Sequence, residues 1–161
     1  MKRLKFLLPA AALALALNGV GLGADVGTHL MTFDFQAINE IEVTGSPNLT
    51  VALAVAGEQP QEVTDSLSTC AITTNGVNKR ITASIDTAMP AYVTLEVCVA
   101  APSGSGTSQG YVTLTTSASN VVTGISHVAD SSPTITYKLS ANVQAGVLST
   151  DARTVTFTLL D

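Results

Sequence analysis

Residues Met31 to Thr44 read MTFDFQAINEIEVT, and this stretch decides the fold class. Successive side chains of a β-strand point to opposite faces, so a half-buried strand alternates apolar and polar residues. A helix would scatter the same residues around its circumference. The stretch alternates in this way, and its apolar positions are Met31, Phe33, Phe35, Ala37, Ile41 and Val43. It therefore predicts a long N-terminal strand.

The alternation breaks near residues 38–39, where an unbroken strand would place Asn39 in the core and Ile38 in water. At ~3.3 Å per residue the full run would reach roughly 46 Å, far longer than a usual strand. We therefore expect the run to bend, to split in two or to reach beyond its own domain, with the division at Ile38-Asn39. A single first strand that kinks at a bulge fits the same break.

The first 24 residues have the pattern of a secretory signal peptide. A basic start (Lys2, Arg3 and Lys5) precedes an apolar run from Phe6 to Leu17 and small residues from Gly19 to Ala24. The apolar run is short for a membrane span and contains a proline. We therefore expect cleavage after Ala24, no membrane span after cleavage, and a secreted protein that is extracellular or bound to the cell surface.

The composition favours one small acidic domain over residues 25–161. Removing 24 of 161 residues leaves 137, enough for a single core. Three of the seven basic residues lie in the predicted signal peptide. Residues 25–161 therefore keep four basic and twelve acidic residues, a net charge of −8. Such a charge argues against nucleic acid as a partner.

The remaining sequence alternates repeatedly between short strand patterns and turns. Strands are expected at 49–55, 69–74, 77–85, 93–99, 111–116, 135–143 and 154–160. Asn75-Gly76 predicts a type I′ hairpin between the second and third of these. The pattern predicts an all-β fold, a single antiparallel β-sandwich of immunoglobulin-like or Greek-key type with about eight or nine strands.

Cys70 and Cys98 are the two cysteines, and an even pair in an exported chain predicts a disulfide. Cys98 has the opposite parity to the apolar residues of its strand, so we expect its side chain to point away from the core. The parity of Cys70 is less clear. We predict a bridge between neighbouring strands on an outer face, with two free thiols as the alternative.

Several short motifs have residue types that occur in chemical sites. Residues 106–110 match the G-x-S-x-G nucleophile elbow around Ser108, but no helix follows them. His29 and His127 are not within metal-ligand spacing of a cysteine or of each other. Glu40 and Glu42 share one face of their strand, as is typical of the solvent-exposed face of a half-buried strand. We therefore expect no catalytic, cofactor or metal site and no enzymatic activity. Asn48 begins a glycosylation sequon, whose use depends on the host.

The end of the chain carries a resemblance. Residues 145–148 read AGVL, and after a spacer residues 155–159 read VTFTL. This layout resembles secreted fimbrial or spore-coat-type subunits, whose ending often reads A-G-x-[YL], a short spacer and V-x-V-x-V. The terminal Asp161 and the lack of a penultimate tyrosine depart from the chaperone-usher pattern, so an assembly chaperone remains an open partner.

The resemblance implies assembly by donor-strand complementation, in which the N-terminal strand of one subunit completes the sheet of the next. Residues 31–37 would then be the donor strand, and residues 40–44 would stay with their own domain. The predicted assembly strand as a whole comprises Met31, Phe33, Phe35, Ala37, Ile41 and Val43. The expected function is a structural subunit of an extracellular filament, pilus or surface matrix, a head-to-tail homopolymer. The alternatives are a monomeric module that binds a sugar or protein through the loop 102–110, and a small hydrolase built on Ser108.

Overall fold

The computed structural model describes residues 26–161, so the predicted signal peptide lies outside the described residues. The chain divides into two units, and the second, Phe35–Asp161, holds every strand found within residues 26–161. Residues 26–34 of the first unit have no regular secondary structure. Within residues 26–161 no helix has the length and apolar character needed to cross a membrane.

The fold of the second unit is all-β, as the alternating patterns predict. Its elements are ten strands and one 3-10 helix: β1 (Asn39–Thr44), β2 (Val63–Thr74), β3 (Lys79–Ile85), β4 (Val93–Val99), β5 (Thr107–Ser108), β6 (Val112–Thr113), β7 (Ser119–Ile125), β8 (Val128–Asp130), β9 (Thr134–Ala141), η1 (Val143–Ala145) and β10 (Val155–Leu160).

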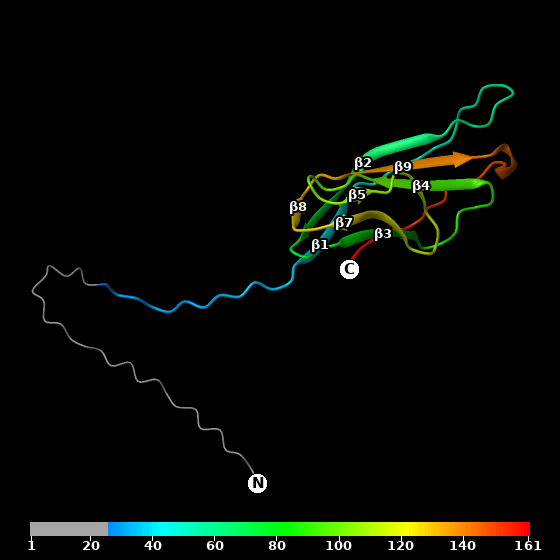
Figure 1. The fold of residues 1–161 in the computed structure, drawn as a ribbon. Coiled ribbons are helices and arrows are strands. Elements are labelled where there is room, and N and C mark those ends of the chain that lie inside the picture. The colour runs from blue at the N-terminus through cyan, green and yellow to red at the C-terminus, as the bar shows by residue number, and fades with distance from the viewer. Residues whose placement is uncertain (1–25) are drawn as a thin grey trace, which may run out of the picture. The chain divides into compact units, whose positions relative to one another are not determined.

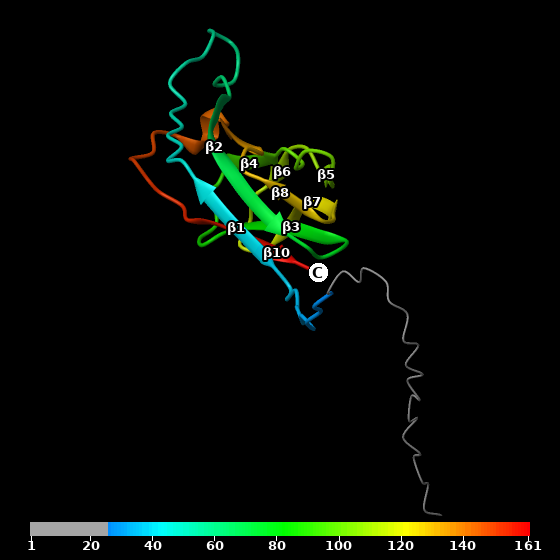
Figure 2. The same cartoon turned by 90° about the vertical axis from the view of Figure 1, so that its left-hand side faces the viewer.

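The strands form two antiparallel sheets that curl into a half-barrel (Figures 1 and 2). The larger sheet has the order β1-β2-β9-β4-β6, with β8 also paired to β2. The smaller sheet has the order β10-β3-β7-β5. The edge strands β1 and β10 come into contact but do not pair, so within the described part of the chain each keeps an unpaired backbone edge.

One core lies between the sheets. Ile72, Val97 and Ile135 from the larger sheet and Ile81, Val122 and Ile125 from the smaller sheet are almost completely buried. Burying each side chain of this size stabilises the folded state by about 1.5–3 kcal/mol, so hydrophobic burial in this core is the main source of stability.

The predicted hairpin at Asn75-Gly76 is wrong. The strands on either side of it, β2 and β3, belong to different sheets, and the connection carries the chain from one sheet to the other. Four residues separate the strands, and the one with positive φ is Asn78, at 53°. The Asn-Gly signal correctly marks a turn, but a local pattern does not specify which strands pair across it.

The strand predicted at 49–55 is also absent. This segment has a single isolated bridge, Ala54 to Pro60, and otherwise no strand partner among the described residues. Leu53 and Val55 are 69% and 58% exposed. The alternation is real, but a strand needs a neighbouring backbone with which to form hydrogen bonds. Residues 45–62 therefore form a long loop.

Candidate self-assembly site

The break at residues 38–39 divides the long N-terminal stretch, since β1 begins at Asn39. Ile41 pairs with Ile72 and Val43 pairs with Cys70, so both face the core from the edge of the larger sheet. Ile41 is half-buried and Val43 is 42% exposed. These two residues of the predicted assembly strand thus belong to the sheet of their own chain.

The residues before the break have no core around them. Met31, Phe33 and Phe35 are 72%, 89% and 75% exposed, and Ala37 is exposed as well. Single exposed apolar residues are ordinary on protein surfaces, but a row of large ones marks an interaction site. This row has the strand alternation and lies outside any strand of the chain.

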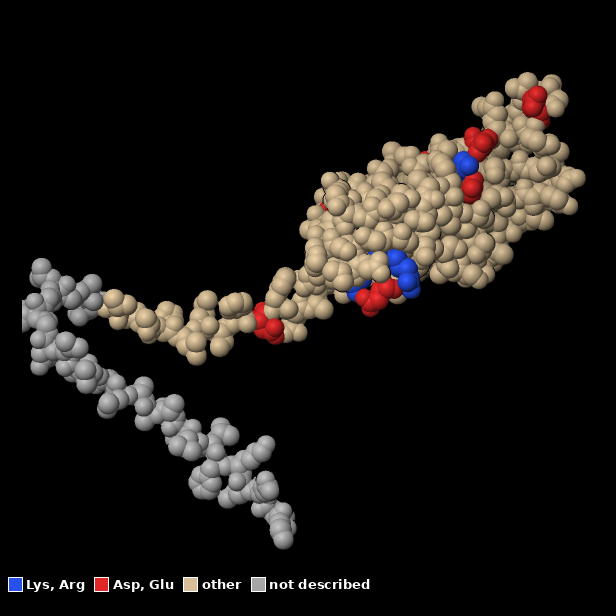
Figure 3. Space-filling view, in the orientation of Figure 1, with Lys and Arg blue, Asp and Glu red and all other residues tan. Residues whose placement is uncertain are grey.

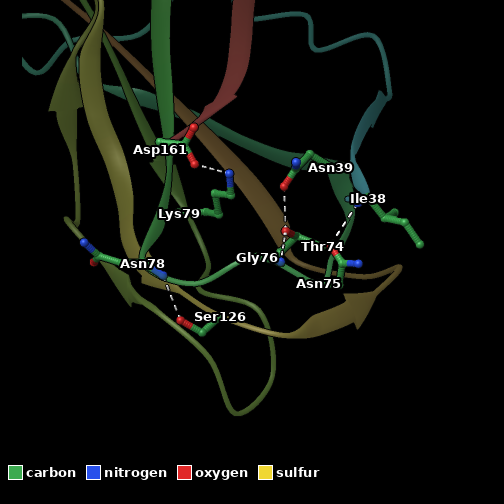
Figure 4. Close-up of polar contacts among 9 residues, drawn as sticks. All are labelled: Ile38, Asn39, Thr74, Asn75, Gly76, Asn78, Lys79, Ser126 and Asp161. Atoms are coloured by element: carbon green, nitrogen blue, oxygen red, sulfur yellow. Dashed lines mark hydrogen bonds and ion pairs between the residues drawn. The ribbon is translucent and has the colours of Figure 1, made fainter. Parts of the chain in front are cut away.

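The side chain of Asn75 holds the chain where this row meets β1 (Figure 4). The backbone N–H of Ile38 donates to Asn75 Oδ1 at 2.8 Å, and Asn75 Nδ2 donates to the carbonyl oxygen of Gln36 at 2.8 Å. The N–H of Asn75 also donates to the carbonyl oxygen of Ile38. One amide side chain therefore holds the backbone of Gln36 and Ile38 at the start of β1.

Neighbouring contacts reinforce this anchor. Thr74 Oγ1 donates to Asn39 Oδ1 at 2.7 Å and accepts a bond from the N–H of Gly76 at 3.0 Å. Nearby, Lys79 pairs with Asp161, and its hydrogen bond is the main cause that lowers the pKa of the Asp161 carboxyl below its ordinary value. Because Asp161 is exposed, the energetic value of that ion pair is small.

A hollow of about 900 Å³ opens at the other end of β1. The segments 48–54 and 142–153 flank it, and Leu49, Met89, Val93 and Leu139 contribute apolar side chains to its lining. Both flanking segments reach the same end of the fold in Figures 1 and 2. Arg153 also lines it, paired with Asp151 at 2.8 Å. The lining of the hollow therefore mixes apolar, polar and charged residues.

Charged groups are few on the face shown in Figure 3, where they gather in small clusters on a largely uncharged surface. Lys138 lies 2.7 Å from Glu96 and 3.5 Å from Glu62, and its ammonium group lies 4.5 Å from the centre of the Tyr111 ring. The hydrogen bond to Glu96 is the main cause that raises the pKa of Lys138. Glu40 and Glu42 are both exposed on β1.

The predicted Cys70–Cys98 disulfide is not present, and both thiols are free. Strand β9 lies between β2 and β4, which carry the two cysteines. Cys70 is fully buried in the core, whereas Cys98 lies between the buried Val97 and Val99 and so faces the other side of its sheet, as its parity predicts. Two residues on opposite faces, one strand apart, cannot meet the geometry of a disulfide.

We predict that the two thiols react very differently with DTNB. In native protein only Cys98 should react, because Cys70 is buried and its burial raises the pKa of the thiol to about 11. Denatured protein should release two equivalents of thionitrobenzoate, one for each thiol. The variant Cys98→Ser should be silent when native and release one equivalent when denatured. Finding no free thiol after unfolding without reductant would contradict this arrangement.

The other sequence motifs have local structural partners. Ser108 lies in β5, where its hydroxyl donates to the carbonyl oxygen of Val99 at 2.6 Å and accepts from the N–H of Gly110 at 3.3 Å. In the same loop, Ser105 Oγ donates to the carbonyl oxygen of Ser126. His127 occupies a turn with φ of 46°. Within residues 26–161 no cluster of three or more His, Cys, Asp or Glu could hold a metal ion.

Comparisons with protein-family models, curated proteins and solved structures give no match to this chain. Sequence reasoning identified the exposed apolar row, but it assigned Asn75 to a hairpin turn and missed its role as the anchor. An asparagine in a turn has the same local signature in both roles.

Proposed function

We propose that this chain is a secreted, non-enzymatic structural subunit that assembles head to tail into a filament, pilus or surface matrix through its N-terminal strand. The single observation that carries the proposal is the row Met31, Phe33 and Phe35, apolar at every second position and largely exposed. In this proposal the two sheets act as an immunoglobulin-like sandwich that receives a strand from a neighbouring copy.

The physics of such an assembly is that of β-augmentation. An extended segment gains affinity from main-chain hydrogen bonds, and its alternate side chains fill apolar sites on the partner. Identical subunits that join through two different surfaces form a ring only if the rotation between neighbouring subunits closes a circle. Otherwise each subunit adds to the last one, and a fibre grows. The anchor at Asn75 supports this role because it holds the base of the segment while leaving the apolar row exposed.

Negative-stain electron microscopy of the chain beginning at Asp25, beside a variant lacking residues 25–37, tests the proposal. We expect filaments from the first protein and only monomers from the second. Circular dichroism is the control, because the shortened protein keeps all ten strands and should retain the β spectrum. A full-length protein that stays monomeric would instead favour a monomeric module that binds a ligand through its loops.

A further inference from the structure

We infer that Asn75 is a site of spontaneous deamidation, that its anchoring contacts slow the reaction in the folded chain, and that the product loosens the segment before β1. The inference goes beyond the proposed function. It concerns a reaction within a single chain, so its tests do not depend on whether the chain forms filaments.

The chemistry of deamidation depends on the residue that follows the asparagine. The backbone nitrogen of that residue loses its proton to the solvent and forms a bond to Cγ of the asparagine. The bond from Cγ to Nδ2 breaks, and Nδ2 takes up a proton and leaves as ammonia. Water then opens the cyclic imide and gives aspartate or isoaspartate. Glycine has no Cβ to hinder this attack, and Asn75-Gly76 is the one asparagine–glycine pair in residues 25–161.

Hydrogen bonds hold both reacting groups of this pair (Figure 4). The leaving nitrogen, Asn75 Nδ2, donates to the carbonyl oxygen of Gln36 at 2.8 Å, and Asn75 Oδ1 accepts from the N–H of Ile38 at 2.8 Å. The attacking nitrogen of Gly76 donates to Thr74 Oγ1 at 3.0 Å. The reaction must break the bonds made by the leaving nitrogen and by the attacking nitrogen.

The peptide group of the turn is fixed from a second side as well. The carbonyl oxygen of Gly76 accepts from the N–H of His127 at 3.0 Å. Asn75 and Gly76 are both half-buried, so water reaches the turn. Because the fold restrains both reacting groups, the reaction proceeds from the minor state in which the turn is open. Its rate then follows the population of that state.

The product cannot make the contacts that Asn75 makes. Aspartate and isoaspartate both carry a carboxylate, which accepts hydrogen bonds but does not donate them. A carboxylate oxygen at the position of Nδ2 would face the carbonyl oxygen of Gln36, and the two oxygens would repel each other. Isoaspartate also adds a carbon atom to the backbone between β2 and β3. Deamidation therefore removes the hold on Gln36 irreversibly.

Peptide mass spectrometry of the chain beginning at Asp25, incubated at mildly alkaline pH, measures the reaction. We expect conversion at Asn75 and far less at Asn142, an internal control that is followed by Val143. Gly76→Ala should nearly stop the reaction at Asn75. Gly76 does not have positive φ, and the added methyl group would meet mainly the flexible end of the Lys79 side chain, so this variant should fold.

A pair of proline variants tests the restraint. Ile38→Pro removes the N–H that Asn75 Oδ1 accepts, at the start of a strand, where proline is tolerated. Losing one hydrogen bond should speed deamidation roughly two- to tenfold. The matched control is Ala37→Pro, because the described hydrogen bonds of Asn75 go to residues 36 and 38 and not to residue 37. Its rate should equal that of the parent chain.

The parent chain in urea gives the same test without a substitution. Unfolding removes every contact of the turn, so deamidation in urea should be at least about tenfold faster than in the native chain. Chymotrypsin tests the effect of the product, with Asn75→Asp as its mimic. Cleavage after Phe35, next to the anchored Gln36, should speed up relative to cleavage after Phe33 in the same chain.

Three results would overturn the inference. Equal conversion at Asn75 and Asn142 would remove the modification site. Native chain that reacts as fast as chain in urea, or proline variants with equal rates, would show that the anchor does not restrain the reaction. An unchanged ratio of the two chymotrypsin cleavages would show that the product leaves the segment held.

Discussion

Replacing both Phe33 and Phe35 with aspartate should abolish filament formation and leave the folded unit as stable as the parent. Both rings are largely exposed in the single chain, so their loss removes no core contact. In an assembled strand each ring would contribute about 1.5–3 kcal/mol on burial, so losing both removes about 3–6 kcal/mol per contact. That loss weakens association by roughly a hundred to ten-thousandfold.

Sedimentation velocity measures the assembly, and thermal unfolding measures the fold. The matched control is Thr28→Asp with Thr32→Asp, which adds the same two charges at positions of opposite parity to the phenylalanines. The control should still assemble, because one face of a donated strand remains in water. Equal assembly by the phenylalanine variant and the parent chain would show that these rings are not the interface.

Gly45→Ala should be among the most destabilising single changes in the chain. Gly45 directly follows β1 and has φ of 113°, a conformation that L side chains rarely adopt. A Cβ at this position would lie 2.8 Å from the Cα of Ser68, a buried residue of β2. Backbone strain and overpacking together should cost roughly 2–5 kcal/mol of unfolding free energy.

Urea denaturation of Gly45→Ala beside Gly57→Ala separates the two terms. Gly57 also has positive φ, at 91°, but a Cβ there meets no atom within 4 Å. The Gly57 variant should therefore lose only the strain term, about 1–2 kcal/mol. Equal losses in the two variants would mean that β1 shifts away from Ser68 at little cost. In that case assembly should suffer as well, since β1 holds the base of the donor segment.

Local sequence patterns correctly predicted several strands. The run from Val93 to Val99 forms β4, and the residues from Val155 onward form β10. The break at Ile38-Asn39 also marks the start of β1. In each case the alternation of side chains decides which face is buried, and alternation is a property of the sequence itself.

The predictions that failed all depend on which segments become neighbours. The pattern at 49–55 is as regular as that of β4, yet within residues 26–161 it makes only the isolated bridge from Ala54 to Pro60 and forms no strand. The cysteine pair predicted a bridge, but β9 lies between the two strands that carry it. Asn75 was expected to form a tight hairpin turn, and instead its side chain anchors the N-terminal segment.

By itself, the sequence determined that the chain is all-β, that its N-terminal stretch divides near residue 38, and which side chains of most strands face the core. Only the tertiary structure decided the strand order, the separation of the two thiols and the absence of a strand at 49–55 in the described chain. The physical reason is that a strand's hydrogen-bond partners lie far away in the sequence. Alternation specifies a face, whereas pairing depends on the packing of the whole core.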